Sequence, residues 1–430
     1  MKNDANKKIN KVDLWVDIIL FLGFLIRLIY VMNTSVYVRG HDVGNYTSLT
    51  DGLINNGHLG YIEYIAKFGH LPDFDPFEVF AFYHPPLHHV IAAGVLRISV
   101  NLGATITEAF KNVQLLTCFY SALTMFFAYL ILEKIAKKQW QIIIPLAMFC
   151  FHPSLIYMSA SINNDMLATL LEMVAIYCAI NWIQSNFKLI HLLLTGLFIG
   201  LGMCAKLTAG MLAFPVGLIM LMRLIEMAKQ SKLGKCIWHY ILFAIVTVPI
   251  GMWWTIRNWV LFRQTPGVPT GDETDFKYVG NVPILEQFSI PKNWGLDYPF
   301  HSPKASYCSN SWLIMFRTAM FTEMWPDPGV ILLNICRALF VGSVVLGIGC
   351  AILTIIVNIV EIVRGNKYIG AFFLCGYITF ILSFIAFVIK YPFTCSSDFR
   401  YIATVLIYSS LSIVQACYVF KRRKNLVSEQ

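Results

Sequence analysis

The sequence predicts an all-α, polytopic membrane protein: a bundle of about ten transmembrane helices with further helices on its exterior surface. Hydrophobic residues make up 57% of the 430 residues and charged residues only 13%, about half the charged share of a soluble domain. The mean hydropathy is +0.63. Apolar runs of about 20 residues recur, and each is long enough to cross a hydrocarbon core of roughly 30 Å. This composition excludes an ordinary soluble enzyme.

The charge distribution predicts which helix ends face the cytosol. Lys7, Lys8 and Lys11 precede the first apolar run at 14–32, and positive charge favours the cytosolic side. The run is followed by no small-residue cleavage site, so we interpret it as an anchor that is not removed. The net charge of +9 reflects the same topology rule rather than nucleic-acid binding. The loop after the first run is therefore expected outside the cytosol.

Residues 86–102 form an apolar run that we predict does not cross the membrane. The run is short, begins within a proline turn and carries Arg97. If it lies along the surface or re-enters, the basic loops at 133–138, 223–235 and 421–424 all fall on the cytosolic side. The remaining spans are then predicted at 113–132, 141–157, 166–183, 189–204, 211–225, 237–260, 330–357, 369–389 and 402–419.

Two long polar segments lie outside the cytosol in this topology, and the whole chain, 1–430, is predicted to be one transmembrane domain. The first exterior loop is 36–102, with surface helices. The second is 263–328, and its amphipathic end at 312–325 indicates another surface helix. These loops are where chemistry in contact with water is expected.

Most of the 11 cysteines lie inside apolar runs, where cysteine behaves as a small hydrophobic residue. No spacing of Cys and His indicates a zinc site. Cys308 and Cys395 lie in polar segments, and either a disulfide between them or two free thiols fits this pattern.

The predicted topology gathers ionisable residues at the exterior ends of different helices. Such groups are costly at membrane depth unless they face water or one another, so two carboxylates with several cations indicate a site for an anionic ligand. The candidates are Asp42, His84, Asp165, Lys206, Arg257 and Arg400.

Most of these candidates also have a structural interpretation. Lys206 and Arg257 fit snorkelling residues near helix ends, and Asp165 fits a helix N-cap. His84 fits a structural histidine in a proline-fixed turn, and Arg400 fits an interfacial anchor. Asp42 follows Gly-His at the membrane face with no helix start after it that needs a cap, which favours a functional role for it.

The order of these motifs resembles the C-type membrane glycosyltransferases (GT-C superfamily), which include the protein mannosyltransferases and the lipid A aminoarabinose transferase. The matching features are an acid in the first exterior loop, a Pro-Pro-Leu turn, a His-Pro…Asn-Asp stretch, a lysine in a Gly-rich helix end, Trp-x-x-Arg-Asn and Phe-Arg-Tyr. They stand here as Asp42, Tyr83 to Leu87, His152 to Asp165, Lys206, Trp254 to Asn258, and Phe399 to Tyr401. Many relatives carry Asp-Glu at the first position, where this chain has Asp42-Val43.

The resemblance implies an inverting glycosyltransferase that moves a sugar from a polyprenyl-phosphate donor to an acceptor hydroxyl on the exterior face. Asp42 would be the base and Asp165 its support. Lys206, Arg257, Arg400 and His84 would bind the donor phosphate. A divalent metal held by His84 with Asp42 or Asp165 is a further possibility in some relatives; no cofactor is certain.

The expected partners are the polyprenyl-phosphate sugar, a lipid, glycan or protein acceptor, and membrane lipids, with no nucleic acid. One alternative is a transporter or flippase for a lipid-linked or anionic solute, with Arg27 and Glu172 on its path. A non-catalytic assembly subunit is a third reading. The sequon at Asn45 lies so close to Asp42 that a glycan would obstruct the site, which favours a bacterial plasma membrane over the endoplasmic reticulum.

Overall fold

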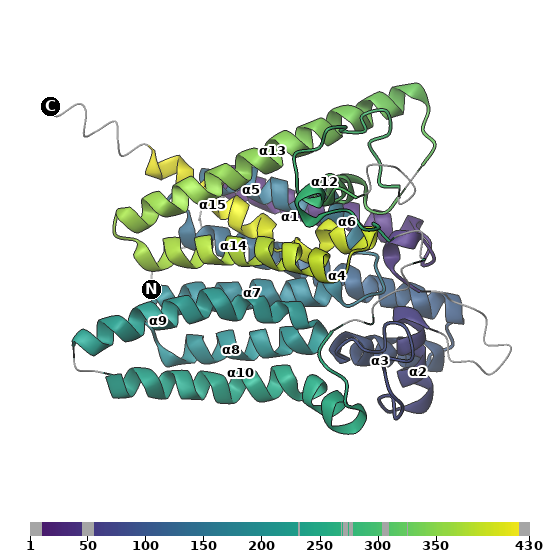
Figure 1. The fold of residues 1–430 in the computed structure, drawn as a ribbon, viewed down its shortest axis with the longest axis horizontal. Coiled ribbons are helices and arrows are strands. Elements are labelled where there is room, and N and C mark those ends of the chain that lie inside the picture. The colour runs from purple at the N-terminus through teal and green to yellow at the C-terminus, as the bar shows by residue number, and fades with distance from the viewer. Residues whose placement is uncertain are drawn as a thin grey trace, which may run out of the picture.

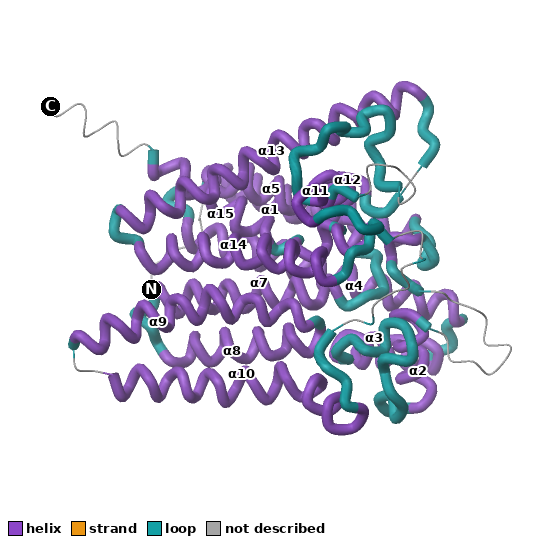
Figure 2. Tube along the Cα trace, in the orientation of Figure 1, coloured by secondary structure: helices purple, strands orange, loops and turns teal. Residues whose placement is uncertain are grey.

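The computed structural model describes residues 11–44, 56–230, 233–267, 269, 274, 278–302, 309–324 and 326–420, and its ribbon is built from helices (Figure 1). Within these residues the only β pairing is an isolated bridge between Tyr278 and Phe393, and Figure 2 shows helices joined by loops. The predicted all-α membrane fold is confirmed.

Seven helices in the described residues are long and apolar enough to cross a membrane, and three shorter apolar helices accompany them. Together they correspond one for one to the ten predicted spans. The long ones are α1 (Lys11–Asn33), α4 (Ile106–Ile135), α7 (Asp165–Gln184), η3 with α9 (Leu207–Leu212, Ala213–Lys229), α10 (Leu233–Phe262), α13 (Val330–Val363) and α14 (Lys367–Lys390). The short ones are α5 (Trp140–Cys150), α8 (Leu189–Ala205) and α15 (Val405–Val419).

The third predicted span is shorter than expected. Helix α5 ends at Cys150, and a separate short helix, α6 (Pro153–Met158), follows. Pro153 has no backbone N–H and disfavours helical geometry in the residue before it. His152 is accordingly extended, with φ −63° and ψ 123°. The break turns the chain just before the start of α7.

The helices that are not predicted to span gather at one end of the bundle, toward the right in Figure 1, where Figure 2 also shows most loops. We call this the loop end. Its elements are α2 (Gly57–Phe68), α3 (Leu87–Asn101), α6, α11 (Ile284–Gln287) and α12 (Ser311–Phe321), with the 3-10 turns η1 (Arg39–His41), η4 (Thr394–Ser397) and η5 (Phe399–Ile402). Fifteen residues make α3 about 22 Å long, which is short for a membrane span.

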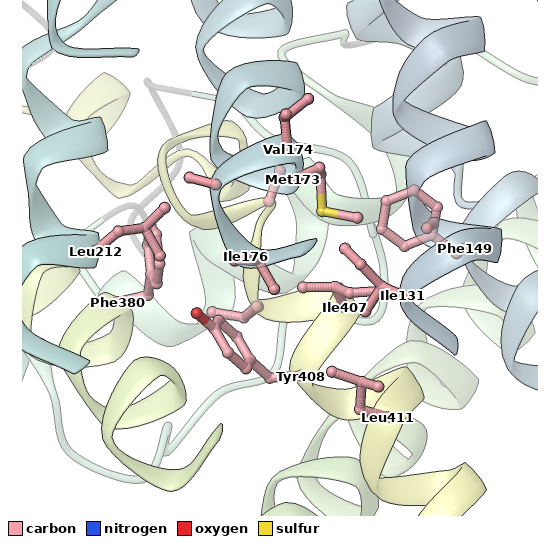
Figure 3. Close-up of a cluster of buried hydrophobic side chains, with 14 of the residues drawn as sticks. Ile131, Phe149, Met173, Val174, Ile176, Leu212, Phe380, Ile407, Tyr408 and Leu411 are labelled. Atoms are coloured by element: carbon pink, nitrogen blue, oxygen red, sulfur yellow. The ribbon is translucent and has the colours of Figure 1, made fainter. Parts of the chain in front are cut away.

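Helix α7 is the centre of the bundle. Its apolar window is 83% buried, compared with 17% for that of α10, so α7 lies among other helices while α10 lies at the margin. Its side chains pack with those of α4, α5, η3, α14 and α15 in the core (Figure 3). Because α7 begins at Asp165, that carboxylate stands at the centre of the loop end.

Candidate functional site

Asp42 is held at the loop end in an unusual backbone conformation. It terminates η1 with φ 57° and ψ 45°, in the left-handed region, which few non-glycine residues adopt. The residue before it is anchored on three sides: the His41 ring is bonded to Tyr30 and to the carbonyl of Ser35, and the His41 carbonyl accepts the N–H of Ile162 at 2.8 Å. Such local strain is typical of functional sites.

Asn163 connects the two predicted carboxylates. Its Nδ2 donates to Asp42 Oδ2 at 3.1 Å and to Asp165 Oδ2 at 3.0 Å. Its Oδ1 accepts the backbone N–H of Asp165 at 3.1 Å. Asp165 is therefore the first residue of α7 rather than its cap, which leaves its carboxylate for ionic contacts.

Two of the predicted cations pair directly with these carboxylates. The Lys206 ammonium, at the end of α8, bonds Asp165 Oδ1. Arg400, in η5, places Nη1 2.9 Å from Asp42 Oδ2 and Nε 3.8 Å from Asp165 Oδ2. Both cations also contact the Tyr401 ring, at 4.5 Å for Lys206 and 5.1 Å for Arg400. Four predicted site residues thus form one connected ion network.

The network sets the charge of Asp42. Burial alone would raise the pKa of this carboxyl, but Arg400, His58, the Asn163 hydrogen bond and Lys206 together hold the pKa well below its ordinary value. Burial opposes the charge of Arg400, while Asp42 raises the pKa of the guanidinium well above its usual range. Both groups are therefore ionised at neutral pH.

His58 is a site residue that the sequence interpretation missed. It lies at the start of α2, where its Nε2 stands 3.7 Å from Asp42 Oδ2. Its ring stacks on that of His84 at 5.0 Å and on that of His89 at 5.2 Å. The predicted residue His84 therefore adjoins the network through its stacking on His58. Burial lowers the pKa of His58 and takes that of His84 well below its ordinary value.

Arg257 stands apart from the ion network. Its guanidinium bonds the carbonyl of Pro72 and, at 3.0 Å, Asn258 Oδ1. It also lies over the ring of Trp254 at 4.9 Å. Trp254 in turn donates to the carbonyl of Tyr83 at 3.1 Å. Arg257 thus joins α10 to the segment that carries His84.

A small pocket that is partly open to solvent lies beside Arg400. Asp398 and Glu323 bring negative charge to it, and Thr322 adopts a φ of 52°. Burial, with Glu323 adding to it, raises the pKa of Asp398 to about 6 against the opposing effect of Arg400. The lining residues are Gly40, Ser154, Tyr157, Met158, Thr322, Glu323, Asp398 and Arg400.

The residues do not fit the divalent metal that the family resemblance allowed. Asp42 and Asp165 direct their carboxylates at Arg400 and Lys206, and the His84 ring is stacked on His58. In the part of the chain that the structure describes, no group of three or more His, Cys, Asp or Glu side chains is arranged to hold a metal ion. Two other sequence predictions, on Cys308 and on the Asn45 sequon, fall outside the described residues.

The model of the dolichyl-phosphate-mannose-protein mannosyltransferase family matches residues 84–262. The matched segment contains His84, Asp165, Lys206 and Arg257. Over this segment the chain is similar to the protein mannosyltransferases. The resemblance predicted from the sequence motifs is thereby confirmed. No curated protein sequence matches the chain.

Two kinds of solved structure are similar to this chain. One is the S. cerevisiae protein O-mannosyltransferase Pmt1-Pmt2 complex bound to the sugar donor, at 16% identity and a TM-score of 0.42, over 64% of this chain and 36% of that chain. The other is ArnT from Cupriavidus metallidurans bound to undecaprenyl phosphate, at 13% identity and a TM-score of 0.41, over 95% of this chain and 78% of that chain. The chain thus spans about a third of the yeast protein's length.

Proposed function

We propose that this protein is an inverting glycosyltransferase, which moves a sugar from a polyprenyl-phosphate donor to an acceptor hydroxyl. The observation that carries the proposal is the ion network of Asp42, Asp165, Lys206 and Arg400 at the loop end of an apolar bundle. The family match over 84–262 supports the reaction class. A site at the membrane edge suits a donor whose tail is a lipid.

Lys206 and Arg400 are the proposed ligands of the donor phosphate. The phosphate leaves with an additional negative charge, and charge-assisted hydrogen bonds to cations stabilise that charge as it develops. Their side chains are only 13% and 15% exposed, so these bonds form in surroundings that exclude most water. Arg257 is bound to the Pro72 carbonyl. We therefore propose that it orders the 36–102 loop and interacts with the phosphate only at longer range. His84 is proposed to line the phosphate site next to His58.

Asp42 is the proposed base. It is ionised, and its side chain remains 27% exposed, so an acceptor hydroxyl can reach it. Deprotonated acceptor oxygen attacks C1 of the sugar on the face opposite the phosphate, and the configuration at C1 inverts. Asp165 holds Lys206 and, with Asn163, fixes the orientation of Asp42.

The pocket beside Arg400 is the proposed acceptor site. Its lining includes Arg400, which contacts Asp42 at 2.9 Å, and Gly40, two residues before Asp42. In this proposal the acceptor hydroxyl reaches Asp42 past Arg400, while the phosphate occupies the Lys206 side. Glu323 and Asp398 provide acceptors for the hydroxyl groups of a sugar or peptide. Whether the acceptor is a lipid, a glycan or a protein is a question for the assay below.

The protein is an integral multi-pass membrane protein, and we propose that the loop end faces the exterior. The chain would act as a single domain, with its first loop at 36–102 and its second at 263–328 covering the site. A bacterial plasma membrane is the proposed location, because a glycan on Asn45, three residues after Asp42, would obstruct the site.

The test is sugar transfer by the purified protein in proteoliposomes. Polyprenyl-phosphate donors that carry different labelled sugars are supplied with extracts containing lipid, glycan and peptide acceptors. We expect label in one acceptor class and inversion of the anomeric configuration in the product. Movement of a labelled donor or ion across the bilayer without transfer would instead establish the transporter alternative. A complete lack of transfer from every donor would overturn the proposed function.

A further inference from the structure

We propose that Asp42 passes the proton of the acceptor hydroxyl to His58 and His89, which form a buried relay behind the base. The inference rests on the proposed function and deepens it. His58 acts through Asp42 and is therefore a positioning and relay residue rather than a group that touches the sugar. Nothing in the sequence motifs pointed to either histidine.

The three side chains make two successive contacts. Asp42 Oδ2 lies 3.7 Å from His58 Nε2, and His58 Nδ1 lies 2.9 Å from His89 Nε2. His58 is 4% exposed and His89 is fully buried, so neither ring exchanges protons with bulk water directly. The first contact is longer than a hydrogen bond, and such contacts in empty active sites commonly tighten when substrate binds.

Two glycines bring His58 to Asp42. Gly44 and Gly57 meet backbone to backbone, both with positive φ. A Cβ on Gly57 would stand 2.3 Å from the carbonyl oxygen of Val43, and one on Gly44 would stand 2.4 Å from the Cα of Gly57. Any side chain at either position would separate the two segments. The close approach is thus built into the backbone beside the proposed base.

The chemistry requires a place for the proton. The bond from acceptor oxygen to C1 forms, the bond from C1 to phosphate oxygen breaks with its electron pair going to the phosphate, and one proton leaves the acceptor. Asp42 receives it, but Arg400 at 2.9 Å stabilises only the ionised carboxylate. A protonated Asp42 is therefore short-lived, and the nearest neutral base that contacts it is His58.

The ring nitrogens can carry that proton onward. His58 takes the proton from Asp42 at an unprotonated Nε2, so the relay uses the tautomer in which His58 Nδ1 carries the hydrogen and donates to His89 Nε2 at 2.9 Å. The Asp42 proton binds His58 Nε2, and the His58 Nδ1 proton passes to the lone pair of His89 Nε2. His89, which already carries a hydrogen on Nδ1, becomes the cation, and His58 is neutral again with its hydrogen on Nε2. The proton thus rests on the pair until solvent or the departing phosphate removes it.

Other charges around His58 keep this pair neutral before the reaction. The cations Lys206 and Arg400 oppose a charged ring, Asp42 and Asp165 favour it, and burial prevails so that the pKa of His58 lies below its ordinary value. The rings of His84 and His88 also face the pair. A neutral, buried base next to Asp42 is the state that a proton receiver needs.

The test compares His58→Gln with His70→Gln, an exposed histidine of the same loop that bonds only the Leu71 carbonyl among described groups. Single-turnover transfer is measured from pH 6 to 9.5. We expect the wild type and His70→Gln to be flat above pH 7, whereas His58→Gln is slower by about 100-fold at pH 7. Its rate should rise by about tenfold per pH unit, because hydroxide must then remove the proton. An His58→Gln profile parallel to that of the wild type would overturn the relay.

Two further measurements separate the relay from misfolding and from failure of the proposed function. The KM for donor should stay unchanged in His58→Gln, and His89→Gln should show an intermediate loss with the same pH slope. Nitrogen NMR of histidine-labelled wild type and Asp42→Asn protein needs no turnover. We expect Asp42→Asn to change the protonation pattern of the His58 ring and not that of His70. An unchanged His58 signal would overturn the relay, and absent transfer by wild type would overturn the function instead.

Discussion

Replacing Asp42 with Asn tests the base most directly, because it removes one charge and almost no volume. Loss of a general base costs about 10² to 10⁴ in rate, so a thousandfold fall, about 4 kcal/mol, is the expected effect on kcat. The structure adds a second expectation. Without the carboxylate, Arg400 loses its 2.9 Å partner and keeps Asp165 and Asp398 only at 3.8 and 3.9 Å, so it becomes more available to a phosphate.

Asp42→Asn should therefore lower kcat while the donor KM stays level or falls, which is the pattern of a lost transition-state interaction. Single-turnover transfer in proteoliposomes gives the rate, and titration of the donor gives the KM. Asp73→Asn is the matched control, since Asp73 is an exposed carboxylate of the same loop that, among the described residues, accepts a hydrogen bond only from the Tyr64 hydroxyl, at 3.1 Å. Asp42→Asn protein that keeps more than a tenth of the wild-type rate, with an active control, would refute the assignment.

Two more perturbations follow from the geometry. Arg400→Lys should raise the donor KM by tenfold or more, because a lysine cannot reproduce the forked hydrogen bonds that a guanidinium donates to a phosphate, whereas Arg257→Lys should change it less than fivefold; equal effects in a donor titration would contradict the separate positions of these residues. Asp398, whose pKa is raised to about 6, binds its proton more tightly when folded than when unfolded, so its charge destabilises the fold above pH 6 and the penalty is relieved as the pH falls toward 4. Asp398→Asn should be more stable than wild type by about 2–3 kcal/mol at pH 7.5. The gap should shrink to about 1 kcal/mol near pH 4.5 in thermal melts and close below pH 4, and a gap that is constant with pH would refute this.

The helical bundle could be predicted from the sequence because length and hydropathy decide whether a segment can cross a membrane. Each of the ten predicted spans has its helix. The error at 141–157 arose from the same reasoning, since the run stays apolar through the point where the helix ends. Pro153 was the residue that indicated the break, but a prediction based on counting apolar residues takes no account of a proline.

The ion network could be predicted because charges are rare in this chain and must meet one another at the membrane edge. Asp42, Asp165, Lys206 and Arg400 do so. The same argument placed Arg257 among them, but a guanidinium is also satisfied by carbonyls and aromatic rings, and Arg257 takes those partners. The predicted membrane topology therefore tells at which end of the bundle a cation lies, but it does not tell which hydrogen-bond acceptor the cation binds.

His58 could not be predicted from composition, because the first polar loop holds several histidines and no period distinguishes them. Its place depends on the contact between Gly44 and Gly57, and these glycines are separated by a dozen residues of polar sequence. The available signal was the glycine beside each functional residue: Gly44 two residues after Asp42, and Gly57 directly before His58. Positive φ at both made the close approach sterically free.

The contact also accounts for the departure from the family pattern at position 43. Many members of the family that the chain resembles have a second acid there, but here Val43 is 6% exposed and packs with Leu59 of α2, whose N–H donates to the Val43 carbonyl at 3.3 Å. A glutamate in this position would bury an unpaired charge against α2. The valine instead allows α2 to pack against residue 43, and this packing places His58 3.7 Å from Asp42. In this chain the second ionisable group beside the proposed base, His58, therefore comes from a neighbouring helix rather than from the next residue.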